Sequence, residues 1–206
     1  MVVTRIEEFS GKRKKVYLDQ RFAFVLYKGE FRTYHVEEGQ VLSEADYRMI
    51  MEEVLPKRAK LRAMSLLQSR DYTVKQLTDK LREGLYPPEI IEEAIAYASS
   101  YHYIDDLRYA VDYITAYESS RSARRIEHDL LKKGIDREVM RAAWREWERK
   151  GGQQDENAMI CALLEKRHYD PETAEPGEWR RIYAFLLRRG FSPESVERAM
   201  NAYKPS

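Results

Sequence analysis

Two hydrophobic patterns divide the chain. Residues 16–36 are rich in Val, Phe and Tyr, with Lys28–Glu30 as a candidate turn, which predicts two or three short strands. From Lys57 onward the apolar residues recur at intervals of three and four, the spacing of amphipathic helices. We therefore expect a small strand-bearing segment followed by a helical region.

A helix is also expected near the end of the first region. Ser43 is a good N-cap, and Asp46 can reach back to it as in a capping box. The helix should end near Leu55, because Pro56 disfavours helical backbone at the residue before it. The sequence thus predicts a boundary close to Pro56.

The helical region repeats itself. The segments LTDKLREGLYPPEIIEEAI (77–95), IEHDLLKKGIDREVMRAAW (126–144) and IYAFLLRRGFSPESVERAM (182–200) align without gaps, at offsets of 49 and 56 residues. Helical proteins show some self-similarity by chance, but here apolar, acidic and glycine positions coincide. The matching apolar positions include Leu77, Ile126 and Ile182, and Leu81, Leu130 and Leu186. We interpret the region as three related units.

Each unit has room for three helices. Opening helices are expected at 57–70, 106–119 and 155–168, middle helices at 74–83, 122–133 and 178–189, and closing helices at 88–100, 137–149 and 193–203. The predicted fold class is mainly α, with three tandem three-helix repeats in an elongated curved array after a small β-strand-containing N-terminal segment. The predicted domains are 1–56, 57–105, 106–152 and 153–206.

Local capping signals agree with these helices. The expected N-caps are Thr73, which forms a capping box with Gln76, Asp136, and Ser192 followed by Pro193. Gly134 and Gly190 end the middle helices, where a left-handed residue is favoured. In the first unit the glycine falls one place early, at Gly84, so a different turn is expected there.

The segment YHYIDDLRYA (101–110) marks the seam between the first two units. Asp105 is a good N-cap for the next helix, and Asp106 then favours the helix dipole in the first turn. A catalytic or metal-binding role would need convergent partners. The histidines and Cys161 lack zinc-ligand spacing, and no glycine-rich phosphate loop or nucleophile elbow occurs. We therefore expect no enzyme activity and no cofactor.

Composition argues against a disordered, membrane-spanning or secreted protein. Charged residues make up 34% of the 206 residues and hydrophobic ones 43%, which is typical of a folded, soluble chain. No apolar run approaches the roughly 18 residues that span a bilayer, and the N-terminus has no apolar secretory segment. The single cysteine excludes an internal disulfide, and a cytoplasmic location is expected. The net charge of +1 means that any basic surface must be local.

Such a local surface is predicted on the middle helices. In the second unit, one stripe is formed by Arg121, Arg125, His128 and Lys132, spaced four, three and four. Basic residues recur at equivalent positions of the units. The candidate partner- or DNA-binding residues are Lys75, Arg121, Arg124, Arg125, Lys132, Lys133, Arg180, Arg181, Arg188 and Arg189. The alternative is a solvated helix face without a binding role.

Two other features are given structural interpretations. The basic run Lys12–Lys15 is expected to be a mobile arm or a solubilising segment. Trp144 and Trp147 lie in a closing helix, and Trp144 aligns with apolar positions of the other units. Core packing is therefore favoured over base stacking for these tryptophans.

The order of these motifs resembles one family. The helical triplets, the seam motif YIDDLRYA and the middle-helix motif RRIEHDLLKKGI look like the RecX family, over about residues 57–203. The segment before them is similar to an N-terminal extension of some members. The family often has glycine where Ser122 stands and glutamate where Asp129 stands, and both departures are mild.

The resemblance implies a non-enzymatic regulator of the RecA recombinase. RecX-like proteins bind the RecA filament on single-stranded DNA in its helical groove, and they inhibit its ATPase and strand exchange. A cytoplasmic bacterial monomer with no membrane partner is implied, with direct DNA contact left open. The competing interpretation is a general nucleic-acid-binding helical module, because three-helix units also resemble helix-turn-helix domains.

Overall fold

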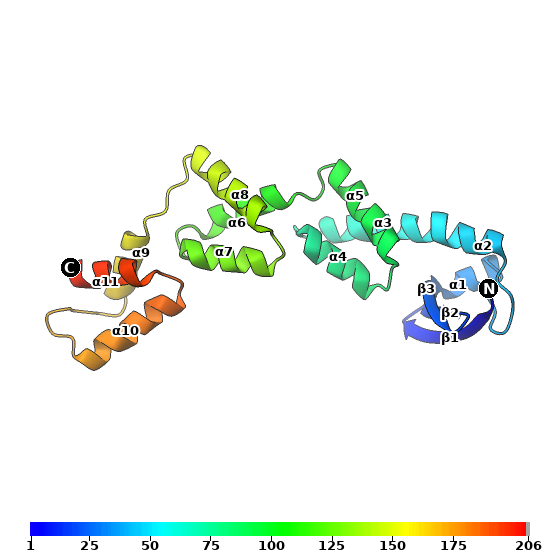
Figure 1. Ribbon diagram of the computed structural model, residues 1–206, viewed down its shortest axis with the longest axis horizontal. Coiled ribbons are helices and arrows are strands. Elements are labelled where there is room, and N and C mark those ends of the chain that lie inside the picture. Colours follow the sequence, from blue (N-terminus) through cyan, green and yellow to red (C-terminus); the bar gives the residue numbers. More distant parts are fainter. Residues whose placement is uncertain (205–206) are drawn as a thin grey trace. The chain divides into compact units, whose positions relative to one another are not determined.

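The computed structural model describes residues 1–204 and divides into two compact units, which meet in sequence at Asp105 and Asp106 (Figure 1). The first unit has one hydrophobic core, which joins the N-terminal sheet to the first helical triplet. The second unit has two cores, one for each of the remaining triplets. The fold is thus mostly helical with one small sheet, as the hydrophobic patterns predict.

The sheet contains the antiparallel strands β1 (Val3–Ser10), β2 (Arg13–Leu18) and β3 (Arg21–Tyr27), in the order β1-β2-β3. The prediction was wrong in two places. Strand structure begins at Val3 rather than near residue 16, and Lys28–Glu30 opens the helix α1 (Lys28–Thr33) instead of forming a turn.

The basic run Lys12–Lys15 is not a mobile arm. Gly11, with a φ of +56°, turns the chain between β1 and β2, and Lys14 and Lys15 pair in register with Glu8 and Glu7 of β1. Opposite charges that face each other across an antiparallel pair stabilise it. Arg13–Lys15 are therefore part of the sheet, and Lys12 lies in the turn before them.

The helix expected to end near Leu55 continues through Pro56. α2 (Glu44–Arg48), the π-helix η1 (Met49–Val54) and α3 (Leu55–Leu67) follow one another without a break. Pro56 has no N–H and crowds the preceding turn of a regular helix. The wider π-turn, in which the Leu55 N–H donates to the carbonyl of Ile50, accommodates it. The predicted boundary between residues 56 and 57 therefore lies within α3.

The three expected triplets are present. They comprise α3 with α4 (Val74–Glu83) and α5 (Pro88–Ser100), then α6 (Asp106–Tyr117), α7 (Ala123–Lys132) and α8 (Arg137–Arg149), then α9 (Glu156–Glu165), α10 (Pro176–Arg188) and α11 (Pro193–Ala202). In each triplet the opening helix packs against the closing helix. The last predicted domain extends to residue 206, and residues 205–206 lie outside the described part.

The predicted caps are confirmed. Ser43 accepts a hydrogen bond from the Asp46 N–H, and Thr73 and Gln76 form a reciprocal capping box. The Asp136 carboxylate accepts from the backbone N–H groups of the first turn of α8 at 2.8 Å, and Ser192 accepts from the Ser195 N–H at 3.0 Å. These local bonds fix where the helices begin.

The middle helices end in the same turn in all three triplets, which the early position of Gly84 did not predict. Gly134 and Gly190 have φ values of +90° and +93°, as expected. In the first triplet Leu85 takes this position with a φ of +60°, while Gly84 stays in the right-handed helical region. A Cβ at Gly84 would lie 2.9 Å from the Tyr86 ring, so the glycine makes room for that ring. The left-handed leucine costs about 1–2 kcal/mol.

The two neighbouring tryptophans pack as predicted. Trp147 is buried, and its indole N–H donates to the Glu118 carboxylate at 2.6 Å. Trp144 packs edge-on against it, with 5.2 Å between ring centroids. Both rings contribute to the core of the second triplet.

The YHYIDDLRYA segment spans the point in the sequence where the two units meet. α6 begins at Asp106, so Asp105 occupies the N-cap position that the sequence indicates. Within residues 1–204, no group of three or more His, Cys, Asp or Glu side chains is arranged to hold a metal ion. None of the helices in this range combines the length and apolarity needed to cross a membrane.

Candidate functional site

One hydrogen bond joins the middle helices of the second and third triplets. Ser122, the buried N-cap of α7, accepts from the Arg125 N–H at 3.3 Å and donates its hydroxyl to the Arg189 carbonyl at 3.0 Å. Gly190 follows directly, and a Cβ there would lie 2.6 Å from the Ser122 oxygen. Gly190 is therefore required twice, for its positive φ and for this close approach.

Further bonds fix the same junction. The Ala123 N–H donates to the Glu156 carboxylate at 3.1 Å, which links the start of α7 to the start of α9. The Gln154 amide donates to the carbonyls of Glu118 and Arg121, each at 2.7 Å. The start of α7 and the end of α10 are thus held beside each other.

This junction gathers four of the predicted basic residues around one hollow. The hollow has a volume of about 300 Å³ and is lined by Arg121, Arg125, Arg188 and Arg189, with Ser120 and Phe191. Alignment of the units pairs Arg125 with Arg181, but in the molecule Arg125 lies near Arg188 and Arg189. Positively charged guanidinium groups gathered around one hollow repel one another, and an anion bound between them offsets that repulsion. The hollow therefore favours an anionic partner.

Arg121 contributes mainly to the structure of the second triplet. Its guanidinium donates to the Tyr113 hydroxyl at 2.5 Å and to the Asp129 carboxylate at 2.9 Å, and it lies 3.7 Å from the Tyr117 ring centroid. Only 33% of its side chain is exposed. Arg121 also precedes the N-cap Ser122, so the predicted stripe of four basic residues on one helix was wrong at this position.

Arg125 is likewise paired internally. Its Nε donates to Asp129 at 3.2 Å, one helical turn away, and the Asp129 side chain is only 11% exposed. Arg125 therefore has a structural role beside its predicted binding role, because it is the ion-pair partner of a nearly buried carboxylate. Asp129 itself was missed as a partner, although its i,i+4 spacing from Arg125 was a readable signal.

Arg188 and Arg189 supply the unbalanced charge of the hollow. Both are exposed at the end of α10, and neither is ion-paired with a carboxylate of residues 1–204. The Arg189 guanidinium lies 4.9 Å from the Phe185 ring centroid, a cation–π distance that limits its motion. These two residues are the strongest candidates of the predicted set.

The other predicted residues are distributed more widely. Arg124, Lys132, Arg180 and Arg181 are exposed on α7 and α10, and the Lys133 ammonium lies 5.3 Å from the Tyr113 ring centroid. Lys75 belongs to the first unit. It is paired at 2.6 Å with Asp79, and its hydrogen bond is the main cause of the lowered pKa of that carboxyl.

A second basic hollow in the third triplet was not predicted. Its volume is about 620 Å³, and Arg181 and Arg189 line it together with Lys166, Arg167 and His168. The Arg167 guanidinium covers the Phe185 ring at 3.7 Å. The run Lys166–His168 was visible in the sequence, but it lies in the turn that follows the opening helix α9, away from the middle helices on which the basic surface was predicted.

The fold and these hollows define a helical-repeat protein with local basic surfaces. Residues 59–97 match the model of the first three-helix domain of RecX, and residues 153–200 that of its third three-helix domain.

Complete relatives agree. The chain is 29% identical over 203 residues to the regulatory protein RecX of Caldanaerobacter subterraneus subsp. tengcongensis, covering 98% of this chain and 99% of that protein. It is 30% identical over 145 residues to the regulatory protein RecX of Trichlorobacter lovleyi, covering 68% of this chain and 92% of that one.

Solved structures share the fold. A crystal structure of regulatory protein RecX aligns with a TM-score of 0.62 at 20% identity, over 97% of this chain and 98% of the other. RecX from Lactobacillus salivarius aligns with a TM-score of 0.60 at 23% identity, over 72% and 96%. The chain belongs to the RecX family, whose members are regulatory proteins and not enzymes.

Proposed function

We propose that this chain binds the RecA nucleoprotein filament on single-stranded DNA and inhibits its ATPase, recombinase and coprotease activities. It would thereby modulate recombinational DNA repair and the SOS response in a bacterial cytoplasm. Family membership supports a regulatory role. The resemblance of the YIDDLRYA and RRIEHDLLKKGI motifs supports RecA as the partner.

The observation that carries the proposal is the arginine hollow between α7 and α10. Arg188 and Arg189 are exposed and unbalanced, while Arg121 and Arg125 are held in place by Asp129. Such a preorganised cationic surface suits acidic side chains or phosphate groups, both of which a protein–DNA filament presents. Since Asp129 already orders Arg121 and Arg125, these two side chains lose little conformational entropy on binding.

A general nucleic-acid-binding module remains the second candidate, because the same hollow suits phosphate. The two functions differ in stoichiometry. A filament regulator acts at concentrations too low to coat free DNA, whereas a general binder must compete for the DNA and is displaced by added salt.

The test is RecA-dependent ATP hydrolysis on single-stranded DNA with this protein titrated in. The proposal predicts inhibition at protein concentrations well below that of the DNA binding sites, and unchanged potency when the DNA is raised at a fixed filament concentration. Inhibition that appears only when the protein covers the DNA would favour the general binder.

A further inference from the structure

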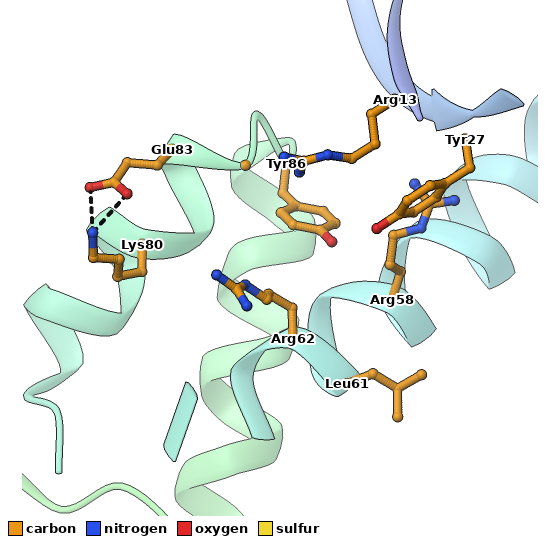
Figure 2. A pocket seen from close by; sticks show the side chains of 9 residues that line it. Arg13, Tyr27, Arg58, Leu61, Arg62, Lys80, Glu83 and Tyr86 are labelled. Carbon is orange, nitrogen blue, oxygen red and sulfur yellow. Dashed lines mark hydrogen bonds and ion pairs between the residues drawn. The ribbon is translucent and has the colours of Figure 1, made fainter. Parts of the chain in front are cut away.

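A separate basic cavity lies within the first unit. It has a volume of about 550 Å³, in the range of small-ligand sites, and lies between the sheet, α3 and the turn after α4. Its cationic lining comprises Arg13 of β2, Arg58 and Arg62 of α3, and Lys80 of α4. Two tyrosines, Tyr27 and Tyr86, complete the polar wall (Figure 2). None of these residues belongs to the predicted binding set.

Two of the four cations have structural partners. Arg58 donates to the Val25 carbonyl at 2.9 Å and is ion-paired with Glu30, so it ties α3 to the sheet and to α1. Lys80 pairs with Glu83 at 2.8 Å. These contacts balance Arg58 and Lys80 and hold the cavity wall in place.

The remaining two guanidinium groups are unbalanced. Within the described chain, neither Arg13 nor Arg62 has a carboxylate partner, although Arg13 lies 5.0 Å from the Phe9 ring centroid. Figure 2 shows their guanidinium groups on opposite sides of Tyr86, whose hydroxyl is directed toward Tyr27. The cavity thus concentrates positive charge around a hydroxyl donor, an arrangement that suits an oxyanion.

The Tyr86 hydroxyl is positioned and protonated so that it can donate a hydrogen bond to such an oxyanion. Gly84 leaves the room that its ring occupies. Burial raises the pKa of Tyr86, and the nearby arginines, with Arg58 foremost, only partly oppose this. The phenol therefore stays protonated at neutral pH and can donate a hydrogen bond.

Tyr27 provides a planar surface beside the charges. The residue is 42% exposed, and the Arg58 guanidinium lies 4.8 Å from its ring centroid. An exposed aromatic ring next to guanidinium groups is how proteins hold an unpaired base and its phosphate together. An acidic side chain would use the arginines but not the ring, so a nucleotide accounts for more of the cavity.

We propose that this cavity binds one nucleotide unit of single-stranded nucleic acid. Arg13, Arg62 and the Tyr86 hydroxyl hold the phosphate oxygens, and Tyr27 stacks on the base. The proposal concerns the first unit alone. It is tested without RecA, so it can fail or succeed independently of filament regulation by the second unit.

The charge test measures fluorescence anisotropy of a labelled 15-nucleotide oligo(dT) titrated with the protein at low salt. Arg13→Gln with Arg62→Gln should weaken binding at least about five-fold, because two phosphate contacts are lost. Arg32→Gln with Arg70→Gln removes the same charge from exposed positions of the same unit outside the cavity. This control should change affinity less than two-fold, and an equal loss in both variants would overturn the site.

The base test separates a nucleotide from a bare anion. Tyr27→Phe should bind like wild type, whereas Tyr27→Leu should lose about five-fold or more, with circular dichroism and the melting temperature confirming the fold. Wild type should also bind an abasic oligomer correspondingly more weakly, which needs no variant. An abasic oligomer that binds equally well would refute base stacking.

Competitors identify the source of the ligand. Free dTMP that displaces the oligomer at similar nucleotide concentration would assign the same chemistry to a mononucleotide and overturn the strand assignment. Poly-glutamate that displaces it more effectively than unlabelled oligo(dT) would overturn the nucleotide in favour of an acidic protein. Weak displacement by both is the result expected for single-stranded nucleic acid.

Discussion

The Ser122 hydroxyl donates to the Arg189 carbonyl over 3.0 Å, although the two residues are 67 positions apart. This contact sets the end of α10 against the start of α7, and it is possible only because residue 190 has no side chain. The basic hollow depends on it, since Arg125 and Arg189 flank the same bond.

Gly190→Ala should therefore destabilise the second unit by about 2–4 kcal/mol, which combines left-handed strain with a clash against Ser122. Gly151 also has a positive φ, of +89°, but open space around it, so Gly151→Ala isolates the strain and should cost about 1–2 kcal/mol. Urea denaturation followed by tryptophan fluorescence measures both. Equal losses would show that the Ser122 approach contributes nothing.

Asp129→Asn should destabilise the second triplet by about 1–3 kcal/mol, because Arg121 and Arg125 lose their shared carboxylate. Glu127→Gln, on the same helix, removes one negative charge without breaking a described pair and should stay within about 0.5 kcal/mol. The urea midpoints of the two variants give the comparison. If Asp129→Asn left the free energy of unfolding unchanged, solvent would be replacing the contacts of Arg121 and Arg125 with Asp129 without cost.

Charge reversal should distinguish the two neighbouring arginines of α7. Arg124→Glu changes an exposed residue and should leave the thermal midpoint nearly unchanged. Arg125→Glu sets a second carboxylate against Asp129 and should cost about 1–2 kcal/mol, a value reduced by the partial exposure of Arg125. Differential scanning calorimetry of each single variant decides the matter, and identical midpoints would contradict the internal role of Arg125.

Tyr86 should make the first unit sensitive to alkali. Below the ordinary tyrosine pKa, about 10, both folded and unfolded chains hold the phenolic proton. Above it the unfolded chain releases the proton first, because burial raises the pKa of Tyr86 in the folded protein. Stability should therefore fall as pH rises from about 10 until folded Tyr86 also ionises.

In the Tyr86→Phe variant, the loss of stability above about pH 10 that is due to Tyr86 should be absent. Phenolate absorbance at 295 nm, taken as wild type minus Tyr86→Phe, should titrate above the ordinary tyrosine range. A difference curve centred at the ordinary pKa would contradict the buried phenol.

Features set by neighbours in the chain could be predicted from sequence. The caps at Thr73, Asp136 and Ser192 are read correctly because each depends on bonds within three residues. The turn at Leu85 was missed because the glycine of this unit stands one position earlier, at Gly84, where it makes room for the Tyr86 ring. The helix through Pro56 was missed because a π-turn replaced the break that proline usually causes.

The arrangement of the sites was not predictable in the same way. Nothing local indicates that Ser122 meets Arg189, or that Arg13 shares a cavity with Arg62. Those contacts arise from tertiary packing between segments far apart in sequence. The basic residues were identified by type and periodicity, whereas their ion-pairing state required the fold.

The central claim is that the hollow between α7 and α10 binds the RecA filament. It is tested most directly by comparing two charge-reversal pairs in the RecA ATPase assay. Arg188→Glu with Arg189→Glu reverses the unbalanced charges of the hollow. Arg137→Glu with Arg145→Glu reverses two exposed arginines of α8 in the same unit. Neither pair disturbs a described ion pair, so both variants should remain folded.

The measurement is the concentration that halves RecA-dependent ATP hydrolysis on single-stranded DNA. The account predicts an increase of at least about five-fold for the hollow variant, since two charged contacts at a preorganised surface are reversed, and little change for the α8 variant. A folded hollow variant that inhibits as well as wild type, or an equal loss in both variants, would contradict the assignment of this surface.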